Sequence, residues 1–222
     1  MLEMFRISTY LDVEKTIGKF LFDNIEYPWQ VLPAIESFIM GLGPMLPAET
    51  FEQRGENVWV ARTAKIADTA SITGPCIIDE NAEIRHCAYI RGNVIVGKGA
   101  VVGNSCEVKN SLLFDEAEVP HFNYIGDSVL GYKAHMGAGS ITSNLKNDKS
   151  NVEVKFPLGE LETGLRKFGA IVGDGVQVGC NTVLNPGCVI GRNTRIYPCL
   201  SIRGWVEEES LVKSKDEIVK VI

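Results

Sequence analysis

Residues 60–108, VARTAKIADTASITGPCIIDENAEIRHCAYIRGNVIVGKGAVVGNSCEV, carry an aliphatic side chain at every sixth position. The series runs on to Phe114, and a small or β-branched residue stands four places after each of its first eight members. A repeat this short can bury its apolar side only by stacking on its neighbours. The period therefore predicts an all-β chain wound as a parallel β-helix, with about 18 residues to a coil.

The six-residue count breaks at Pro120 and returns in the second half of the chain. It holds at Leu130 and Met136 and then runs through Val172, Val178, Leu184, Ile190, Ile196 and Ile202. Glycine follows several of these aliphatic positions, and we expect corners there that need a positive φ. Those glycines are Gly97, Gly103, Gly131, Gly173, Gly179 and Gly191.

Two segments lack the period and divide the chain. Residues 1–55 are expected to form a helical cap on the first coil of the β-helix domain, 56–222, with helices over 12–22 and 29–42. Trp29, Leu32, Ile35 and Ile39 would form its apolar stripe. Residues 143–169 read as a long excursion from the coil, a place where function often lies, although flexible decoration is the competing interpretation.

Composition excludes several classes of partner. The chain has 22 Lys and Arg against 28 Asp and Glu, a formal charge of −6. Without a basic cluster, neither nucleic acid nor an anionic membrane is an expected partner. The first ten residues contain no apolar signal region, and no stretch is long enough to span a bilayer. We therefore expect a cytoplasmic protein.

The six cysteines include no C-x-x-C pair. In a reducing compartment they are expected as free thiols rather than bridges. Cys76, Cys106 and Cys188 occupy the small inward position of the repeat, where a thiol serves as a compact apolar filler.

Arg91 and Lys109 are one predicted coil apart and should stack on adjacent strands about 4.8 Å apart. Two stacked cations repel, so either each has an acidic neighbour or the pair serves an anion such as phosphate. His121 follows the break in the count at Pro120. It is a candidate proton acceptor near neutral pH, although a lone histidine is more often structural.

A metal site is not expected. The gamma-class carbonic anhydrases share this kind of coil and carry an H-x4-H pair of zinc ligands, but the matching place after His121 is Gly126. His135 lies too far along the chain to replace that ligand.

Three stretches resemble the acetyltransferase domain of the bifunctional N-acetylglucosamine-1-phosphate uridyltransferases, above all the archaeal sugar-1-phosphate nucleotidylyltransferase/acetyltransferases. They are RGNV (91–94) with EVKNS (107–111), HFNYIGD (121–127), and GAGS (137–140) running on to Asn144 and Leu145. The similarity covers roughly residues 56–205. The family's nucleotidyltransferase domain, with its glycine-rich nucleotide loop, has no counterpart, so we expect no nucleotidyl transfer.

The resemblance implies a left-handed β-helix, a homotrimer, and transfer of acetyl from acetyl-CoA to the amine of a hexosamine 1-phosphate. His121 matches the family's general base, and Arg91 and Lys109 match its phosphate-binding cations. Tyr124 and Asn144 match residues that contact the sugar, with Asn144 counted among the catalytic residues. The turn Gly137, Ala138 and Gly139 matches the acetyl-CoA site, and Cys180 matches a position that also faces that co-substrate in the family.

This chain departs from the family near the acceptor site. His135 and Leu145 replace an asparagine and a tyrosine of bacterial relatives. The family's lysine beyond Asn144 has two nearby candidates, Lys146 and Lys149, and we assign the substrate contact to Lys149. The alternative function is a non-catalytic module that binds a sugar phosphate or nucleotide sugar, which would have no turnover to lose when His121 is replaced.

Overall fold

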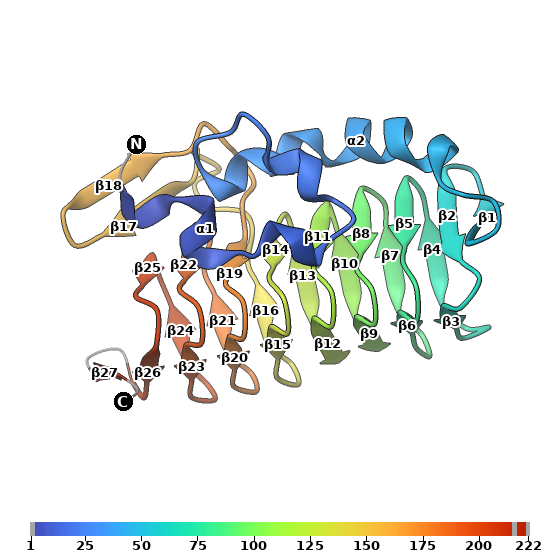
Figure 1. Ribbon diagram of the computed structural model, residues 1–222. Helices are drawn as coiled ribbons and strands as arrows, with labels where there is room; N and C mark the ends of the chain where they lie inside the picture. Colours follow the sequence, from blue (N-terminus) through green and yellow to red (C-terminus); the bar gives the residue numbers. More distant parts are fainter. Residues whose placement is uncertain (1–2, 215–216, 221–222) are drawn as a thin grey trace.

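The computed structural model describes residues 3–214 and 217–220, so positions 1–2, 215–216 and 221–222 of the two predicted domains lie outside the described residues. The chain coils into a three-sided β-solenoid whose sides are three mainly parallel sheets (Figure 1). Sheet A contains β1 (Phe51–Gly55), β2 (Val58–Ala61), β5 (Cys76–Ile78), β8 (Val94–Val96), β11 (Ser111–Leu113), β14 (Val129–Leu130), β19 (Ala170–Val172), β22 (Cys188–Ile190) and β25 (Trp205–Val206).

The other two sheets complete each coil. Sheet B contains β3 (Lys65–Ile66), β6 (Glu83–Ile84), β9 (Val101–Asn104), β12 (Glu118–His121), β15 (His135–Met136), β20 (Gln177–Val178), β23 (Arg195–Ile196), β26 (Ser210–Val212) and β27 (Ile218–Lys220). Sheet C contains β4 (Ser71–Thr73), β7 (Tyr89–Arg91), β10 (Glu107–Lys109), β13 (Tyr124–Gly126), β16 (Ile141–Thr142), β21 (Val183–Leu184) and β24 (Ser201–Ile202). The predicted β-solenoid of hexapeptide repeats is thus confirmed.

The interior is filled by the repeating aliphatic residues, together with the small residues between them. Cys76, Cys106 and Cys188 are buried there as free thiols, as predicted, whereas the other three cysteines are exposed. Burial raises the pKa of the Cys188 thiol to about 12, so this group stays neutral and inert.

The repeat loses one residue, and this loss comes before the break that was predicted at Pro120. Lys65 and Glu83 pair across 18 positions, but between Lys109 and Ser111 one residue is lost and the next coil is 17 residues long. Leu113 takes the inward place beside Val96, so Phe114 points outward. The prediction for Phe114 was therefore wrong.

The corners use asparagine more than the predicted glycines. Asn81, Asn110, Asn181 and Asn193 adopt φ between 46° and 57°, a region that asparagine tolerates better than most residues. Gly97 has no positive φ. It is needed because a Cβ there would lie 2.6 Å from the backbone nitrogen of Asp115 on the next coil. None of the six glycines predicted to have a positive φ, Gly97 among them, adopts one, so that prediction was wrong.

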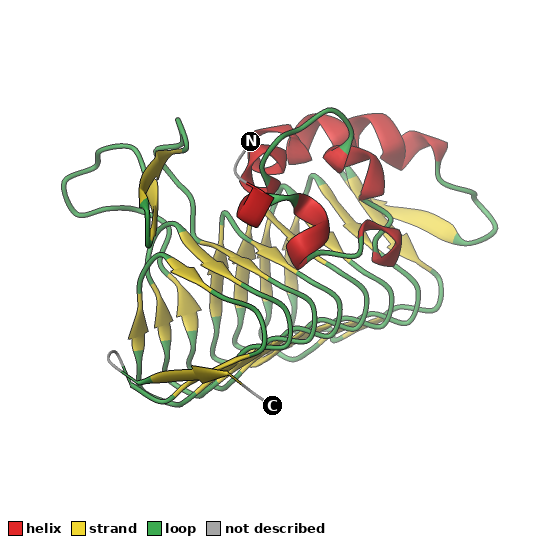
Figure 2. Ribbon diagram, turned by 60° about the vertical axis from the view of Figure 1, so that its left-hand side comes forward, coloured by secondary structure: helices red, strands yellow, loops and turns green. Residues whose placement is uncertain are grey.

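The N-terminal segment is helical but covers a side of the solenoid, not its open end (Figure 2). Residues 29–42 are a 3₁₀-helix followed by α2 (Ile35–Leu42), and all four residues of the predicted stripe are buried. The remaining short elements are η1 (Glu3–Phe5), α1 (Ile7–Tyr10), η2 (Val13–Lys15), η3 (Lys19–Phe22), η4 (Pro28–Ala34) and η5 (Gly43–Met45). A single helix over 12–22 does not form, because Thr16 is extended and the Lys15 carbonyl accepts a hydrogen bond from Asp115 N of the solenoid.

Sheet A explains where this segment lies. Its outward residues include Ile77, Ile95, Leu112, Val129 and Ile171, all fully buried in one cluster with Trp29 and α2. The first coil stays open instead, as a hollow of about 650 Å³ bordered by inward residues such as Ile66 and Ile72. The predicted cap on the first coil was wrong because outward apolar residues of sheet A draw the segment onto that face.

The predicted excursion leaves the coil after β16 and rejoins it at β19. Residues that lie side by side on the two adjacent coils, such as Ile141 and Val183, are therefore 42 positions apart in the sequence. The excursion forms a hairpin of β17 (Glu153–Phe156) and β18 (Gly159–Glu162), in which β17 lies against β22 and β25 of sheet A (Figure 1). Phe156 packs edge-on against Phe5 with ring centroids 5.4 Å apart. The N-terminal segment and the excursion therefore support one another.

Candidate functional site

Arg91 and Lys109 are the last residues of β7 and β10, which are neighbouring strands of sheet C on adjacent coils. They lie next to each other, as predicted, because the two strands pair in register. Each has an acidic neighbour. Arg91 donates to Glu107 Oε1 at 2.5 Å, and Lys109 Nζ lies 3.2 Å from Asp127 Oδ2. Glu107 raises the pKa of the Arg91 guanidinium. Both cations keep further donors, since a guanidinium has five N–H groups and an ammonium three.

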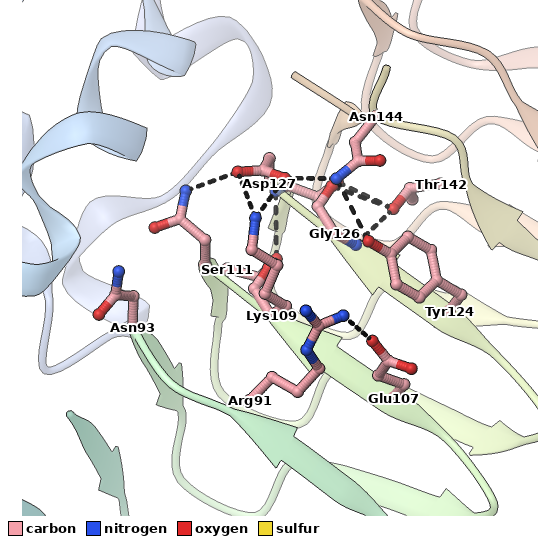
Figure 3. A network of polar contacts seen from close by, with 12 residues as sticks. Arg91, Asn93, Glu107, Lys109, Ser111, Tyr124, Gly126, Asp127, Thr142 and Asn144 are labelled. Carbon is pink, nitrogen blue, oxygen red and sulfur yellow. Dashed lines mark hydrogen bonds and ion pairs between the residues drawn. The ribbon is translucent and has the colours of Figure 1, made fainter. Parts of the chain in front are cut away.

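Tyr124, Asp127 and Asn144 complete this polar corner, which is defined by Arg91, Glu107, Lys109, Tyr124, Asp127 and Asn144 (Figure 3). Asn144 Nδ2 donates both to Asp127 Oδ2 and, at 3.2 Å, to the Tyr124 hydroxyl. Burial and the nearby Asp127 carboxylate raise the pKa of Tyr124, so its hydroxyl stays protonated. A Cβ at Gly126 would lie 2.5 Å from that hydroxyl, so only glycine leaves room for the tyrosine.

Both ends of the excursion are attached to this corner. Phe168 N donates to Asn144 O at 3.0 Å, and Gly169 N donates to Asp127 O at 2.8 Å. Leu145 and Lys167 form a β-bridge across the base of the excursion. A hollow of about 320 Å³ lies between Ser143 and Leu145 at the start of the excursion, β17, and the coil residues Asn185 and Arg203, and no residue of the polar corner lines it. The polar corner thus holds both ends of the excursion.

His121 ends β12 of sheet B, at the corner from which the chain enters β13 of sheet C. Its side chain is exposed, and its backbone N–H donates to Asn123 Oδ1 at 3.0 Å. Asn123 is buried and donates in turn to the carbonyls of Gly137 at 2.8 Å and Ser140 at 2.9 Å. One buried amide therefore joins the turn after His121 to the turn that contains Ala138.

The predicted co-substrate residues lie along the same edge. Gly139 N donates to the His121 carbonyl at 2.9 Å, and Asn181 N donates to the Ala138 carbonyl at 2.9 Å. Cys180 is exposed on the coil that carries Asn181. His121, Ala138, Gly139 and Cys180 thus occupy three successive coils, which we call the histidine edge.

Lys149 is not brought to the polar corner. It is exposed in the excursion, and only its backbone N–H has a described hydrogen bond, to the Lys146 carbonyl at 3.0 Å. Lys146 lines the 320 Å³ hollow at the start of the excursion, together with Lys155. His135 lies on sheet B, where its Nδ1 is 2.8 Å from Glu118 Oε2.

Sequence reasoning did not single out Glu107 and Asp127, the two carboxylates of the polar corner. A usable signal was present, because both stand in the EVKNS and HFNYIGD stretches close to the cations. Asp127 also stands at a corner with φ of 46°, next to the glycine that admits Tyr124.

Within the described part of the chain, no group of three or more His, Cys, Asp or Glu side chains is arranged to hold a metal ion. No described helix is long and apolar enough to cross a bilayer.

Comparisons with known proteins agree with the repeat. Residues 72–155 match the family described as "GMPPB C-terminal domain", and residues 169–204 match "Bacterial transferase hexapeptide (six repeats)". The "Bifunctional protein GlmU" of Methanococcus maripaludis is 36% identical over 215 residues, which are 89% of this chain and 48% of the relative. The "Bifunctional sugar-1-phosphate nucleotidylyltransferase/acetyltransferase" of Sulfurisphaera tokodaii is 35% identical over 159 residues, 64% of this chain and 40% of the relative.

Among solved structures, the "Acetyltransferase domain of PglB from Neisseria gonorrhoeae FA1090 in complex with acetyl coenzyme A" is 16% identical with a TM-score of 0.32, over 60% of this chain and 53% of that one. The chain spans about half the length of the GlmU relatives that it matches. The repeat and the three-sided coil make this chain a hexapeptide-repeat β-solenoid, which is similar to the GlmU-type bifunctional proteins over about half of their length.

Proposed function

We propose that this protein is an acetyl-CoA-dependent N-acetyltransferase acting on a hexosamine 1-phosphate, with His121 as general base. The observation that carries the proposal is the polar corner, where two stacked cations and a tyrosine hydroxyl of sheet C meet a fixed amide. His121 ends β12 of sheet B, just before the chain enters β13 with Tyr124. The relative from Sulfurisphaera tokodaii, whose name includes both a sugar-1-phosphate and an acetyltransferase activity, supports the same reaction.

Arg91 and Lys109 would hold the phosphate. Their carboxylate neighbours keep the cation pair from repelling itself in the free protein, and the remaining N–H donors are available to an anion. Arginine offers a planar pair of donors and lysine a point charge, a combination suited to a phosphate monoester.

Tyr124 and Asn144 would bind the sugar with opposite polarity. The Tyr124 oxygen accepts from Asn144, so its own O–H is free to donate. Both N–H groups of the Asn144 side-chain amide donate inside the protein, so its side-chain oxygen, Oδ1, is the group left for a ligand. A hydroxyl and an amine, each able to donate and accept, match such a pair.

In the reaction, the sugar amine forms a C–N bond to the thioester carbonyl while the C–S bond breaks and coenzyme A leaves as a thiolate. His121 takes the proton that the amine loses, and this proton then neutralises the thiolate. The backbone N–H of Ala138 would stabilise the oxyanion of the tetrahedral intermediate, whereas the N–H of Gly139 already donates to the His121 carbonyl. Holding amine and thioester together supplies much of the remaining rate.

The test is acetyl transfer measured by mass spectrometry, which avoids thiol dyes that six cysteines would confuse. The protein is incubated with acetyl-CoA and glucosamine 1-phosphate, galactosamine 1-phosphate or their 6-phosphates. We expect one added acetyl group on a 1-phosphate and none on a 6-phosphate. No acetylation of any of the four compounds would contradict the proposal.

Replacing His121 by alanine should lower kcat by about 10²- to 10⁴-fold, the usual contribution of a general base. Binding of the amino sugar phosphate should persist. His135→Ala is the matched control, because it removes a second histidine from the same strand ladder and should leave kcat within about threefold. Binding without turnover in the wild-type protein would favour the non-catalytic sugar-phosphate module instead.

A further inference from the structure

Asp127 is the most heavily bonded carboxylate of the polar corner, and its side chain is only 6% exposed. Its Oδ1 accepts from Asn110 Nδ2 at 2.9 Å, and Lys109 Nζ lies 3.2 Å from Oδ2. Oδ2 also accepts from Asn144 Nδ2. Asp127 therefore joins side chains from three successive coils (Figure 3).

The carboxylate decides how the Asn144 amide is turned. An ionised carboxylate only accepts hydrogen bonds, so the group facing it must be the NH₂ end of the amide. The second N–H of that end reaches Tyr124, which leaves Asn144 Oδ1 pointing away from Asp127 (Figure 3). Without a carboxylate, nothing at this corner distinguishes the two ends of the amide so strongly.

We propose that Asp127 is a positioning residue that sets the hydrogen-bond polarity of the acceptor site, so that Asn144 presents an acceptor and Tyr124 a donor to the ligand. This inference rests on the proposed function for the identity of that ligand. Asp127 also holds Lys109 beside Arg91, but it does not itself contact the substrate. Its role is to make the site selective for a ligand that donates to Asn144, such as an amine or hydroxyl.

Asp127→Asn tests this role with little change of shape. The asparagine either turns its own NH₂ toward Asn144, which sets donor against donor, or turns its oxygen there and faces the Asn110 amide and Lys109 with a donor. We expect KM for glucosamine 1-phosphate to rise about tenfold or more. KM for acetyl-CoA should stay within about twofold, because the histidine edge is joined through Asn123 and not through Asp127.

The chain offers a matched control in Asp174, a carboxylate at a different corner with a side chain 14% exposed. It accepts from Asp12 N at 2.7 Å and Tyr132 N at 2.8 Å, and lies 3.1 Å from Arg192. Asp174→Asn should lower the melting temperature and leave both KM values unchanged. If Asp127→Asn or Asp174→Asn raised KM for both glucosamine 1-phosphate and acetyl-CoA, the effect of Asp127 would be one of stability alone. That result would overturn the proposal.

Exchanging the two side chains provides a rescue that a purely structural role does not predict. In the double variant Asp127→Asn with Asn144→Asp, the amide at 127 donates to a carboxylate at 144, whose other oxygen faces the ligand as an acceptor. The Tyr124 hydroxyl, which accepts from Asn144 in the wild-type protein, then donates to that carboxylate. We expect this protein to bind glucosamine 1-phosphate more tightly than the Asp127→Asn single variant. Equal or weaker binding by the double variant would contradict the assigned polarity.

Failure of the two proposals can be told apart by calorimetry with glucosamine 1-phosphate. If the wild-type protein binds the compound but does not acetylate it, the proposed reaction is wrong and the same variants still test Asp127 through affinity. If it acetylates the compound and Asp127→Asn leaves KM unchanged, the positioning role is wrong. Neither binding nor acetylation by the wild-type protein would overturn both.

Discussion

Asp79 is a buried carboxyl group whose ionised form lowers the stability of the native protein. It is 6% exposed, and its Oδ1 accepts from Glu80 N at 2.7 Å. Burial raises its pKa above the ordinary value of 3.8, although the nearby Lys98 acts in the opposite direction. Since the folded state holds the proton more tightly than the unfolded state, the contribution of Asp79 to stability is present below pH 3.8 and is lost as the pH rises through the native pKa.

Asp79→Asn should therefore stabilise the protein at neutral pH. The amide oxygen can still accept from Glu80 N, while the buried charge is gone. We expect a higher free energy of unfolding than wild type at pH 7 and a difference that shrinks toward zero near pH 3.8, measured by urea unfolding across this range. A variant less stable than wild type at pH 7 would show that attraction to Lys98 outweighs the cost of burial.

The N-terminal segment is the element on which the cover of sheet A depends. Trp29 is 1% exposed, stacks on Tyr27 with centroids 5.0 Å apart and lies 5.8 Å from Phe168. Trp29→Ala should lower the free energy of unfolding by about 3–5 kcal/mol, because it leaves a large cavity among aromatic rings. Urea unfolding measures the loss, and Phe20→Ala, which truncates a ring that is 64% exposed, is the control.

A loss below about 1 kcal/mol for Trp29→Ala would mean that the segment is held on sheet A by other contacts. Because Phe168 directly precedes Gly169, whose N–H donates to Asp127, the loss should also reach the polar corner. Binding of glucosamine 1-phosphate should weaken in Trp29→Ala and not in Phe20→Ala.

Periodicity predicted the solenoid because each inward row repeats at the same short spacing, and stacking leaves few other ways to bury it. It could not place Phe114, since Leu113 and Phe114 are both apolar and either fits the inward row. The position of the N-terminal segment was likewise hidden. Ile77, Ile95 and Leu112 sit beside inward residues, and one-dimensional spacing did not show that they form an outward apolar face.

The candidate site was predicted in part for the same reason. Coil arithmetic correctly stacked Arg91 on Lys109, because both follow inward residues of paired strands. It left open whether each cation has an acidic neighbour. Glu107 and Asp127 answer that question through side-chain geometry across coils, which spacing along one chain does not contain. Lys149 was placed by nearness in sequence alone, within an excursion that does not follow the coil.

The N-terminal segment covers the outer face of sheet A. In the part of the chain that the structure describes, sheets B and C are the broad faces that other copies could contact. The histidine edge lies where these two sheets meet, so a second copy packed on either would supply a wall beside His121. We expect a homotrimer, because closed cyclic assembly buries the same two faces on every copy. Sedimentation equilibrium should give three times the chain mass of 24.4 kDa.

Tyr89 provides the test of that assembly. It lies on the outer face of sheet C and is 40% exposed in the single chain. Tyr89→Glu should weaken association about tenfold or more, because an unpaired carboxylate in an interface costs several kcal/mol. Phe20→Glu on the N-terminal segment, whose ring is 64% exposed, should leave the trimer intact. A monomeric wild-type protein that still acetylates its substrate would show that one chain carries the complete site.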